Sequence, residues 1–318
     1  MIIKDYLAYL SGKLSATLSY FGVHDKSYGR VRVKPMYDAD DPMQYYFDLK
    51  VKPDYAGAFD NNGIPQYNYK GKLMYFPIQV AEYGLVNCLK YLAYNDEKYL
   101  CRFKTVADWL CERQEPDGCW LQYSNVTKFS LNTPWKSAMA QGVVLSCLCR
   151  AYRLFNDEKY LNAGKIALQP FLIEVAAGGV TRAVNGDVFY EEYPSAKANH
   201  VLNGFIFALL GLLDLARLDS QSKANELYVN GVNTLKKWLP RYDIGYWSLY
   251  HIGSNKLKNP ASISYHNLHI RQLKVMHLIT KDEIFQQYSD LWMDYFNGRF
   301  NGLRTLPSKI LYNLIYGL

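Results

Sequence analysis

A repeated segment constrains the fold of this chain more than any other feature of its sequence. The hexapeptide NDEKYL occurs at 95–100 and again at 156–161, each time directly after a run of apolar residues. A related turn, TKDEIF, spans 280–285. A self-similar unit of about 60 residues indicates a repeat architecture, in which each unit must pack against its neighbours to bury its apolar face.

Each repeat unit predicts two helices of different character. The first is apolar on most sides and should be buried, whereas the second is amphipathic and should face solvent, as in EKYLCRFKTVADWLCERQ. Glycines recur in the buried helices at intervals of 58 and 62 residues, at Gly84, Gly142 and Gly204. The four predicted inner helices contain YGLVNCLKYLAY, QGVVLSCLCRAYRLF, NGFIFALLGLLDLARL and HIRQLKVMHLI.

These units predict an all-α fold, an (α/α) toroid or incomplete barrel of about four helical hairpins. Glycine–aromatic segments follow the outer helices and predict turns or short β-hairpins on one rim. Loops at one end of a rigid scaffold are a common place for binding and catalysis. The segments are EPDGCWLQY, GGVTRAVNGDVFYEEYP and DIGYWSLYHIG.

Residues 1–70 differ from the repeats and predict an extended N-terminal arm that packs on a toroidal domain formed by 71–318. Weak strand alternation at 45–53 favours one hairpin in this arm. Ten tyrosines lie between Tyr6 and Tyr69, and they offer an alternative in which the arm forms one wall of a cleft.

The composition permits a carbohydrate-binding protein and gives little support to several other classes. The chain has 29 tyrosines, whose apolar faces and polar tips suit sugar rings, and a net charge of +7 that permits an anionic partner. No nucleic-acid motif is present. The six cysteines lack metal-ligand spacing, and neither a secretory signal nor a membrane-spanning run is recognisable, so we expect a cytoplasmic protein without a metal.

Several motifs, in order, resemble those of the D-glucuronyl C5-epimerase C-terminal domain family. The combination of EEYP, VLNGF and YHxxHIxQL is the most specific part of this resemblance. The large β-rich insertion of animal members is missing before the DWL helix, which indicates a bacterial type. The matching stretches are YFPIQVAEYGL, DWLCERQEPDGCW, PWKSAMAQG, YEEYPSAKANHVLNGF, GYWSLY and YHNLHIRQL.

The resemblance implies inversion of C5 of D-glucuronate to L-iduronate in a heparan-type polymer, without a cofactor. It also implies a catalytic group of Glu192, Tyr193, Tyr250 and Tyr265. Removal of H5 needs stabilised enediolate charge, and inversion needs a proton donor on the opposite face. We expect Tyr193 and Tyr265 to be the opposed proton carriers, Glu192 to accept or share a proton, and Tyr250 to bond the uronate.

Four further residues are candidates for substrate binding, each with a structural alternative. Gln79 begins an inner helix, and Trp135 can stack on a sugar or pack in the core. Asn203 can cap its helix or face the cleft. His266 can bind sugar hydroxyls or orient Tyr265, and together with a second histidine it is more typical of core polarity than of a metal site.

Two departures from the family pattern bear on the substrate. Gly253 stands near the place of a family arginine, and SIS at 262–264 replaces RWD. A guanidinium suited to a carboxylate is therefore lost, with Arg182, Lys136 and Lys256 as candidate replacements. The main hypothesis is an epimerase acting on a glucuronate-containing anionic polysaccharide, as in capsule biosynthesis, with a homodimer as the assembly considered. A polysaccharide lyase and a non-catalytic glycan-binding protein remain the alternatives.

Overall fold

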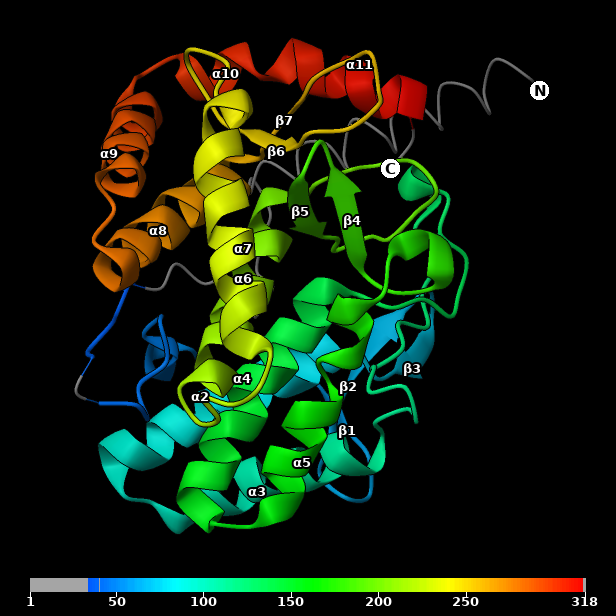
Figure 1. Ribbon diagram of the computed structural model, residues 1–318, viewed down its shortest axis with the longest axis vertical. Helices are drawn as coiled ribbons and strands as arrows, with labels where there is room; N and C mark the ends of the chain where they lie inside the picture. The colour runs from blue at the N-terminus through cyan, green and yellow to red at the C-terminus, as the bar shows by residue number, and fades with distance from the viewer. Residues whose placement is uncertain (1–33, 40, 317–318) are drawn as a thin grey trace.

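The computed structural model describes residues 34–39 and 41–316, which fold mainly into successive helical hairpins (Figure 1). The inner helices contact one another in chain order, α2 against α4, α4 against α6 and α6 against α8. The all-α prediction is confirmed. The hairpins are α2 (Pro77–Tyr94) with α3 (Glu97–Glu112), α4 (Ala138–Phe155) with α5 (Glu158–Ile166), α6 (Leu202–Ala216) with α7 (Ala224–Trp238), and α8 (Ile263–Thr280) with α9 (Glu283–Asn297). Two more helices follow, α10 (Asn301–Arg304) and α11 (Leu306–Tyr316).

The repeated hexapeptide forms the turn between inner and outer helix. Asn95 and Asn156 end α2 and α4 in the left-handed conformation, with φ of 51° and 50°. Asp96 and Asp157 then cap α3 and α5, since each side chain accepts a hydrogen bond from the backbone N–H two residues on. Asparagine tolerates left-handed backbone better than most residues, so this dipeptide both ends one helix and starts the next. Lys281 takes the left-handed position in the last hairpin.

Glycine allows the two central inner helices to cross at close range. A Cβ on Gly142 of α4 would overlap the backbone of Phe207 and Ala208 in α6. A Cβ on Gly211 of α6 would in turn overlap Gly142. The recurring glycines of the inner helices therefore mark places where another chain segment fills the space of a side chain.

Short antiparallel strand pairs connect the helices, as the glycine–aromatic segments predicted. The connecting pairs are β4 (Thr181–Val184) with β5 (Asp187–Tyr190), and β6 (Leu249–His251) with β7 (Asn259–Pro260). In the N-terminal arm, β1 (Ala58–Phe59), β2 (Pro65–Tyr69) and β3 (Lys72–Met74) form a three-stranded sheet.

The strand expected at 45–53 is wrong in its position. Leu49–Val51 form a short 3-10 helix, η2, and Phe47 makes only an isolated bridge to Pro35. The reason is tertiary packing: the consecutive residues Tyr45, Tyr46 and Phe47 are all buried in the main core, so their side chains do not alternate between core and solvent.

The arm is attached to the helices by a buried ion pair. Arg150 of α4 donates to Asp214 of α6 at 2.8 Å and to the Gln44 carbonyl oxygen at 2.5 Å. The Tyr46 hydroxyl donates to the same carboxylate at 2.9 Å. The described part of the arm thus shares the core of the helices. The boundary at residue 70 stays a prediction, and most of the arm's N-terminal half lies outside the described residues.

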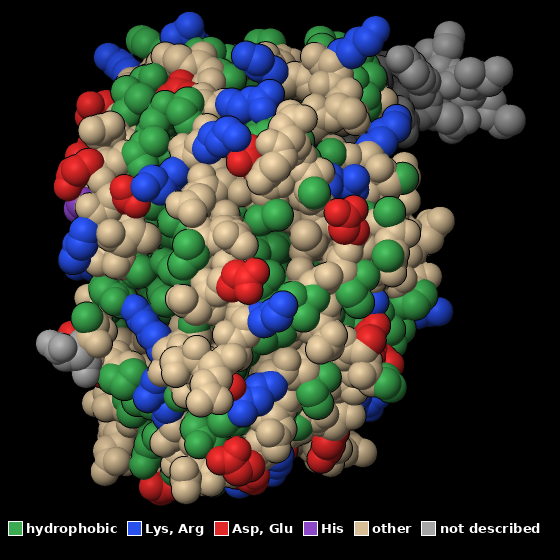
Figure 2. Space-filling model, viewed as in Figure 1, with side chains coloured by type: hydrophobic (Ala, Val, Ile, Leu, Met, Phe, Trp, Pro, Cys, Tyr) green, Lys and Arg blue, Asp and Glu red, His purple; other side chains and the backbone are tan. Residues whose placement is uncertain are grey.

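The surface and the helices show two further properties. On the face seen in Figure 2, Lys and Arg side chains are interspersed with Asp and Glu and do not form one continuous basic patch. Within residues 34–39 and 41–316, no helix combines the length and apolarity needed to cross a membrane.

Candidate active site

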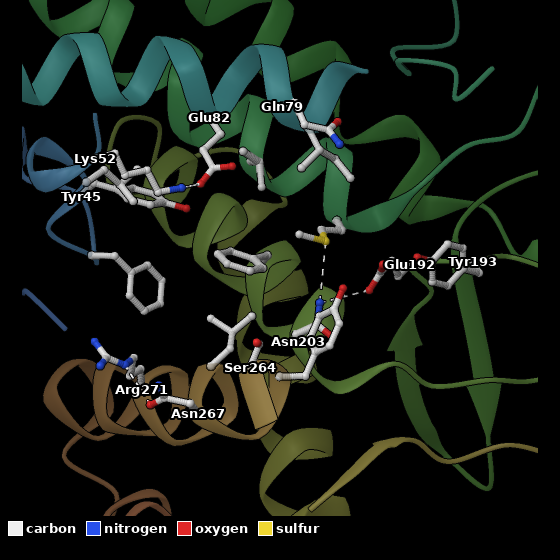
Figure 3. A pocket seen from close by; sticks show the side chains of 18 residues that line it. Tyr45, Lys52, Gln79, Glu82, Glu192, Tyr193, Asn203, Ser264, Asn267 and Arg271 are labelled. Carbon is white, nitrogen blue, oxygen red and sulfur yellow. Dashed lines mark hydrogen bonds and ion pairs between the residues drawn. The ribbon is translucent and has the colours of Figure 1, made fainter. Parts of the chain in front are cut away.

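A pocket of about 310 Å³ opens among the inner helices and the N-terminal arm. Figure 3 shows Tyr45, Lys52 and Glu82 at one end, Glu192 and Tyr193 at the other, and Asn203 between them. Tyr45 and Phe47 line this space, so the arm does form part of its wall, as one of the two readings of its tyrosines predicted. Of the eight predicted site residues, the pocket lining includes Gln79, Glu192, Tyr193, Asn203 and Tyr265.

Glu192 follows β5 and is held against the start of α6. Its side chain is 5% exposed, and Asn203 Nδ2 donates to its Oε2 at 3.4 Å. A Cβ on Gly204 would overlap this carboxyl group, so the glycine provides the space that Glu192 occupies. Burial raises the pKa of Glu192 from 4.5 to about 7, although Tyr193, Lys128 and Asn203 oppose the rise. A carboxyl group with this pKa can take or give a proton near neutral pH.

Tyr193 lies beside Glu192 within an aromatic cluster. Its ring stacks on Phe129 at a centroid distance of 4.6 Å and lies 5.4 Å from the ring of Trp135. Burial and the adjacent Glu192 hold its pKa well above the usual value, while a hydrogen bond with Tyr250 acts in the opposite direction. The hydroxyl is therefore protonated in the free protein.

Tyr265 reaches the pocket from the first turn of α8. Ser262 caps this helix, since its Oγ accepts from the Tyr265 backbone N–H at 3.1 Å. The first residue of SIS, which stands in place of the family's RWD, therefore serves to start the helix. Tyr250 is buried, and its ring packs edge-on against Tyr265 at 4.8 Å. The structure thus brings the four predicted catalytic residues into one cluster, with Tyr250 behind the pocket wall.

His266 lies away from the pocket. Its Nδ1 lies 2.7 Å from Ser248 Oγ, and its Nε2 lies 3.0 Å from the Trp292 carbonyl oxygen. His269 Nδ1 shares the same hydroxyl at 2.9 Å. Burial lowers the pKa of His266 to about 3, so its ring is neutral. This environment favours the alternative in which His266 is a buried polar residue of the core. It can act on Tyr265 only indirectly, through the helix that carries both residues.

The other binding candidates lie in or near the pocket. Gln79 is half-buried in the first turn of α2. Asn203 does not cap α6, and its Oδ1 has no hydrogen-bond partner among the described residues. Trp135 donates from Nε1 to the Ser124 carbonyl oxygen at 2.7 Å and supports Tyr193 from behind. Trp120, a second tryptophan of this region, is fully buried in the core and packs there instead of facing a sugar.

The first carboxylate of EEYP has a separate, structural environment. Glu191 is fully buried, and Arg182 Nε donates to it at 3.1 Å. Both glutamates are therefore buried, so EEYP is not a rim turn whose carboxylates are merely solvated. Two of the cations proposed to replace the family arginine are already engaged: Arg182 with Glu191, and Lys136 with Asp117 at 2.7 Å. The third, Lys256, is exposed.

The sequence analysis missed the segment between α3 and α4 that packs on these tyrosines. Lys128 lies in a short 3-10 helix, η3 (Thr127–Phe129), with its Nζ 4.7 Å from the Phe129 ring and 4.8 Å from the Tyr250 ring. Burial lowers the pKa of Lys128 to about 8, and the charge of Glu192 opposes that shift. No periodicity marks this segment, so its position beside the tyrosines could not be predicted from the sequence.

The far end of the pocket is also polar. Lys52 is buried and forms an ion pair with Glu82. Arg271 of α8 donates to Asn267 at 3.1 Å. Within the described parts of the chain, no group of three or more His, Cys, Asp or Glu side chains is arranged to hold a metal ion.

Comparison with known proteins assigns the family. The sequence model described as D-glucuronyl C5-epimerase C-terminus matches residues 114–294. The chain belongs to the D-glucuronyl C5-epimerase C-terminal family. The matched residues, 114–294, include all four candidate catalytic residues as well as η3.

Two relatives illustrate the range of the similarity. The D-glucuronyl C5-epimerase of Caenorhabditis elegans is 38% identical over 222 residues, covering 64% of this chain and 36% of the relative. The chain therefore spans about a third of that protein's length. An uncharacterized protein of Methanocaldococcus jannaschii, MJ1128, is 27% identical over 288 residues, covering 82% of this chain and 91% of the relative.

Proposed function

We propose that this protein inverts C5 of D-glucuronate to L-iduronate within a glucuronate-containing polysaccharide. The observation that carries the proposal is the meeting of Glu192, Tyr193 and Tyr265 at one pocket, from two separate parts of the chain. The family membership and the Caenorhabditis elegans relative's name support the same reaction class. The polar far end of the pocket, lined by Lys52, Glu82 and Arg271, suits the hydroxyl groups of a polysaccharide.

The chemistry assigns opposed roles to the two tyrosines. H5 is acidified by the neighbouring carboxylate, and its removal gives an enediolate that inverts when a proton arrives on the other face. Tyr193 is hydrogen-bonded to Glu192, whose pKa of about 7 makes it a suitable acceptor for the tyrosine's proton. In the proposed sequence Tyr193 passes its proton to Glu192 as it takes up H5, while Tyr265 protonates C5 from the opposite side.

Tyr250 completes this arrangement through two neighbours. It packs edge-on against Tyr265 and is hydrogen-bonded to Tyr193. A donor at this position stabilises a phenolate on Tyr193, which lowers the barrier for the first proton transfer. We propose that Tyr250 also binds the uronate, and that Gln79 and Asn203 bond its hydroxyl groups.

Tyr193→Phe and Tyr265→Phe test the proposal directly. Each variant keeps the aromatic ring and removes only the hydroxyl, so each should abolish deuterium exchange at C5 of heparosan in D2O, followed by NMR. Persistence of exchange in both variants would show that the tyrosines are not the proton carriers. Unsaturated chain ends in the wild-type reaction would instead identify a lyase, and tight polymer binding without exchange would identify a non-catalytic glycan-binding protein.

A further inference from the structure

One lysine beside the candidate catalytic residues forms no ion pair with a described side chain. Lys128 Nζ makes no ion pair or hydrogen bond to any residue in 34–39 or 41–316, apart from its contacts with the faces of Phe129 and Tyr250. It is half-buried. A lysine in such a position usually pairs with an anion, because burial of an unpaired charge is unfavourable.

The neighbouring lysine differs in this respect. Lys309 of α11 lies 5.9 Å from the Tyr250 ring, on which Lys128 also lies. Its Nζ donates to Asn259 Oδ1 at 2.5 Å and to the Pro260 carbonyl oxygen at 3.1 Å. Lys309 is thus held by the β6–β7 segment, where its hydrogen bonds go to the protein and burial holds its pKa well below the usual value.

The place of the missing family arginine cannot readily supply the charge. A Cβ on Gly253 would lie 2.9 Å from the Ala198 carbonyl oxygen and 3.2 Å from His251 Nδ1, so a side chain there requires the backbone to shift. Arg182 and Lys136 are already paired with carboxylates. Lys128 and Lys309 both contact the Tyr250 ring, and of these two only Lys309 donates hydrogen bonds to described protein groups.

We propose that Lys128 is the residue that binds the uronate carboxylate in this chain, in the role that the lost guanidinium would have had. Its Nζ lies over the Tyr250 ring, while Tyr193 stacks on the adjacent Phe129. A carboxylate bound here is therefore close to both the hydroxyl of Tyr250 and the proton-transferring pair of Tyr193 and Glu192. The same positive charge stabilises the enediolate that forms when H5 leaves.

The proposal rests on the proposed function for its ligand, but binding tests it independently of catalysis. The probes are heparosan and carboxyl-reduced heparosan, in which glucose replaces glucuronate, measured by isothermal titration calorimetry. The wild type should prefer the carboxylated polymer. Lys128→Met should lose roughly 10- to 100-fold of that affinity, as is typical for the loss of one charge-assisted contact, and should bind both polymers alike.

Two matched variants make the outcome specific. Lys128→Arg keeps the charge and should keep the preference for the carboxylated polymer, whereas Lys258→Met removes an exposed lysine of the β6–β7 connection and should leave the preference unchanged. Near-ultraviolet circular dichroism verifies that each variant is folded. A Lys128→Met protein that still prefers the carboxylated polymer overturns the proposal, as does a wild type without any preference. If the wild type does not exchange H5, the proposed reaction is wrong, but the binding comparison still tests the role of Lys128.

Discussion

Substitution of Glu192 by glutamine should raise the free energy of unfolding at high pH while it abolishes activity. Burial raises the pKa of Glu192 from 4.5 to about 7. Between these values the unfolded chain releases the proton while the folded protein keeps it, so rising pH favours unfolding by about 1.4 kcal/mol per pH unit. The wild type therefore loses roughly 3 kcal/mol from this group as pH rises through the window, and the loss is complete above pH 7.

Glutamine has the shape of the protonated side chain and never ionises. Glu192→Gln should match the wild type near pH 4 and exceed its stability near pH 8. The pKa of about 7 already includes the attraction between the carboxylate and Lys128, so we expect a gain of about 3 kcal/mol at pH 8. The same variant should lose C5 exchange, because the proton acceptor is gone.

Urea denaturation at a series of pH values measures this difference. Glu283→Gln, a change in an exposed side chain in the first turn of α9, is the control, and its curve should run parallel to that of the wild type. A gap between wild type and Glu192→Gln that does not change with pH would refute the reasoning, because it would mean that folding does not shift the pKa of this carboxyl group. Full activity in the variant would refute the catalytic role.

Two further substitutions test the packing. Gly204→Ala should reduce the rate of C5 exchange by more than about tenfold, because the new methyl group displaces the Glu192 carboxyl group and small positional errors are costly in catalysis. Gly164→Ala is the control: its Cβ would lie 3.4 Å from its nearest neighbour, so the rate should not change. Arg150→Met leaves the buried Asp214 without its cation and should cost about 3–5 kcal/mol in urea denaturation; a loss below about 1 kcal/mol would show that the pair does not stabilise the arm.

The helices were predictable because the apolar runs, the capping residues and the glycines of the sequence all indicate the same helix boundaries. An apolar run followed by Asn–Asp specifies a helix end, a left-handed turn and a new cap, and Asn95–Asp96 and Asn156–Asp157 form these features. The glycines of the inner helices also had a physical meaning, since Gly142 permits the crossing of α4 and α6.

The candidate site was predictable only where motifs marked it. EEYP and the tyrosine of YHNLH meet at the pocket, although no local pattern showed how two segments so far apart in the chain would come together. Lys128 escaped notice because it lies in an irregular loop, where neither periodicity nor capping residues fix a position. His266 was ambiguous for a related reason: only the partners of its ring, Ser248 and Trp292, separate a structural histidine from a binding one.

Incubation of the wild-type protein with heparosan in D2O, followed by NMR at C5, tests the central claim most directly. The account predicts deuterium at C5 together with new iduronate signals and no chain cleavage. A folded protein that leaves H5 in place on heparosan, N-sulfated heparosan and other glucuronate polymers would contradict it.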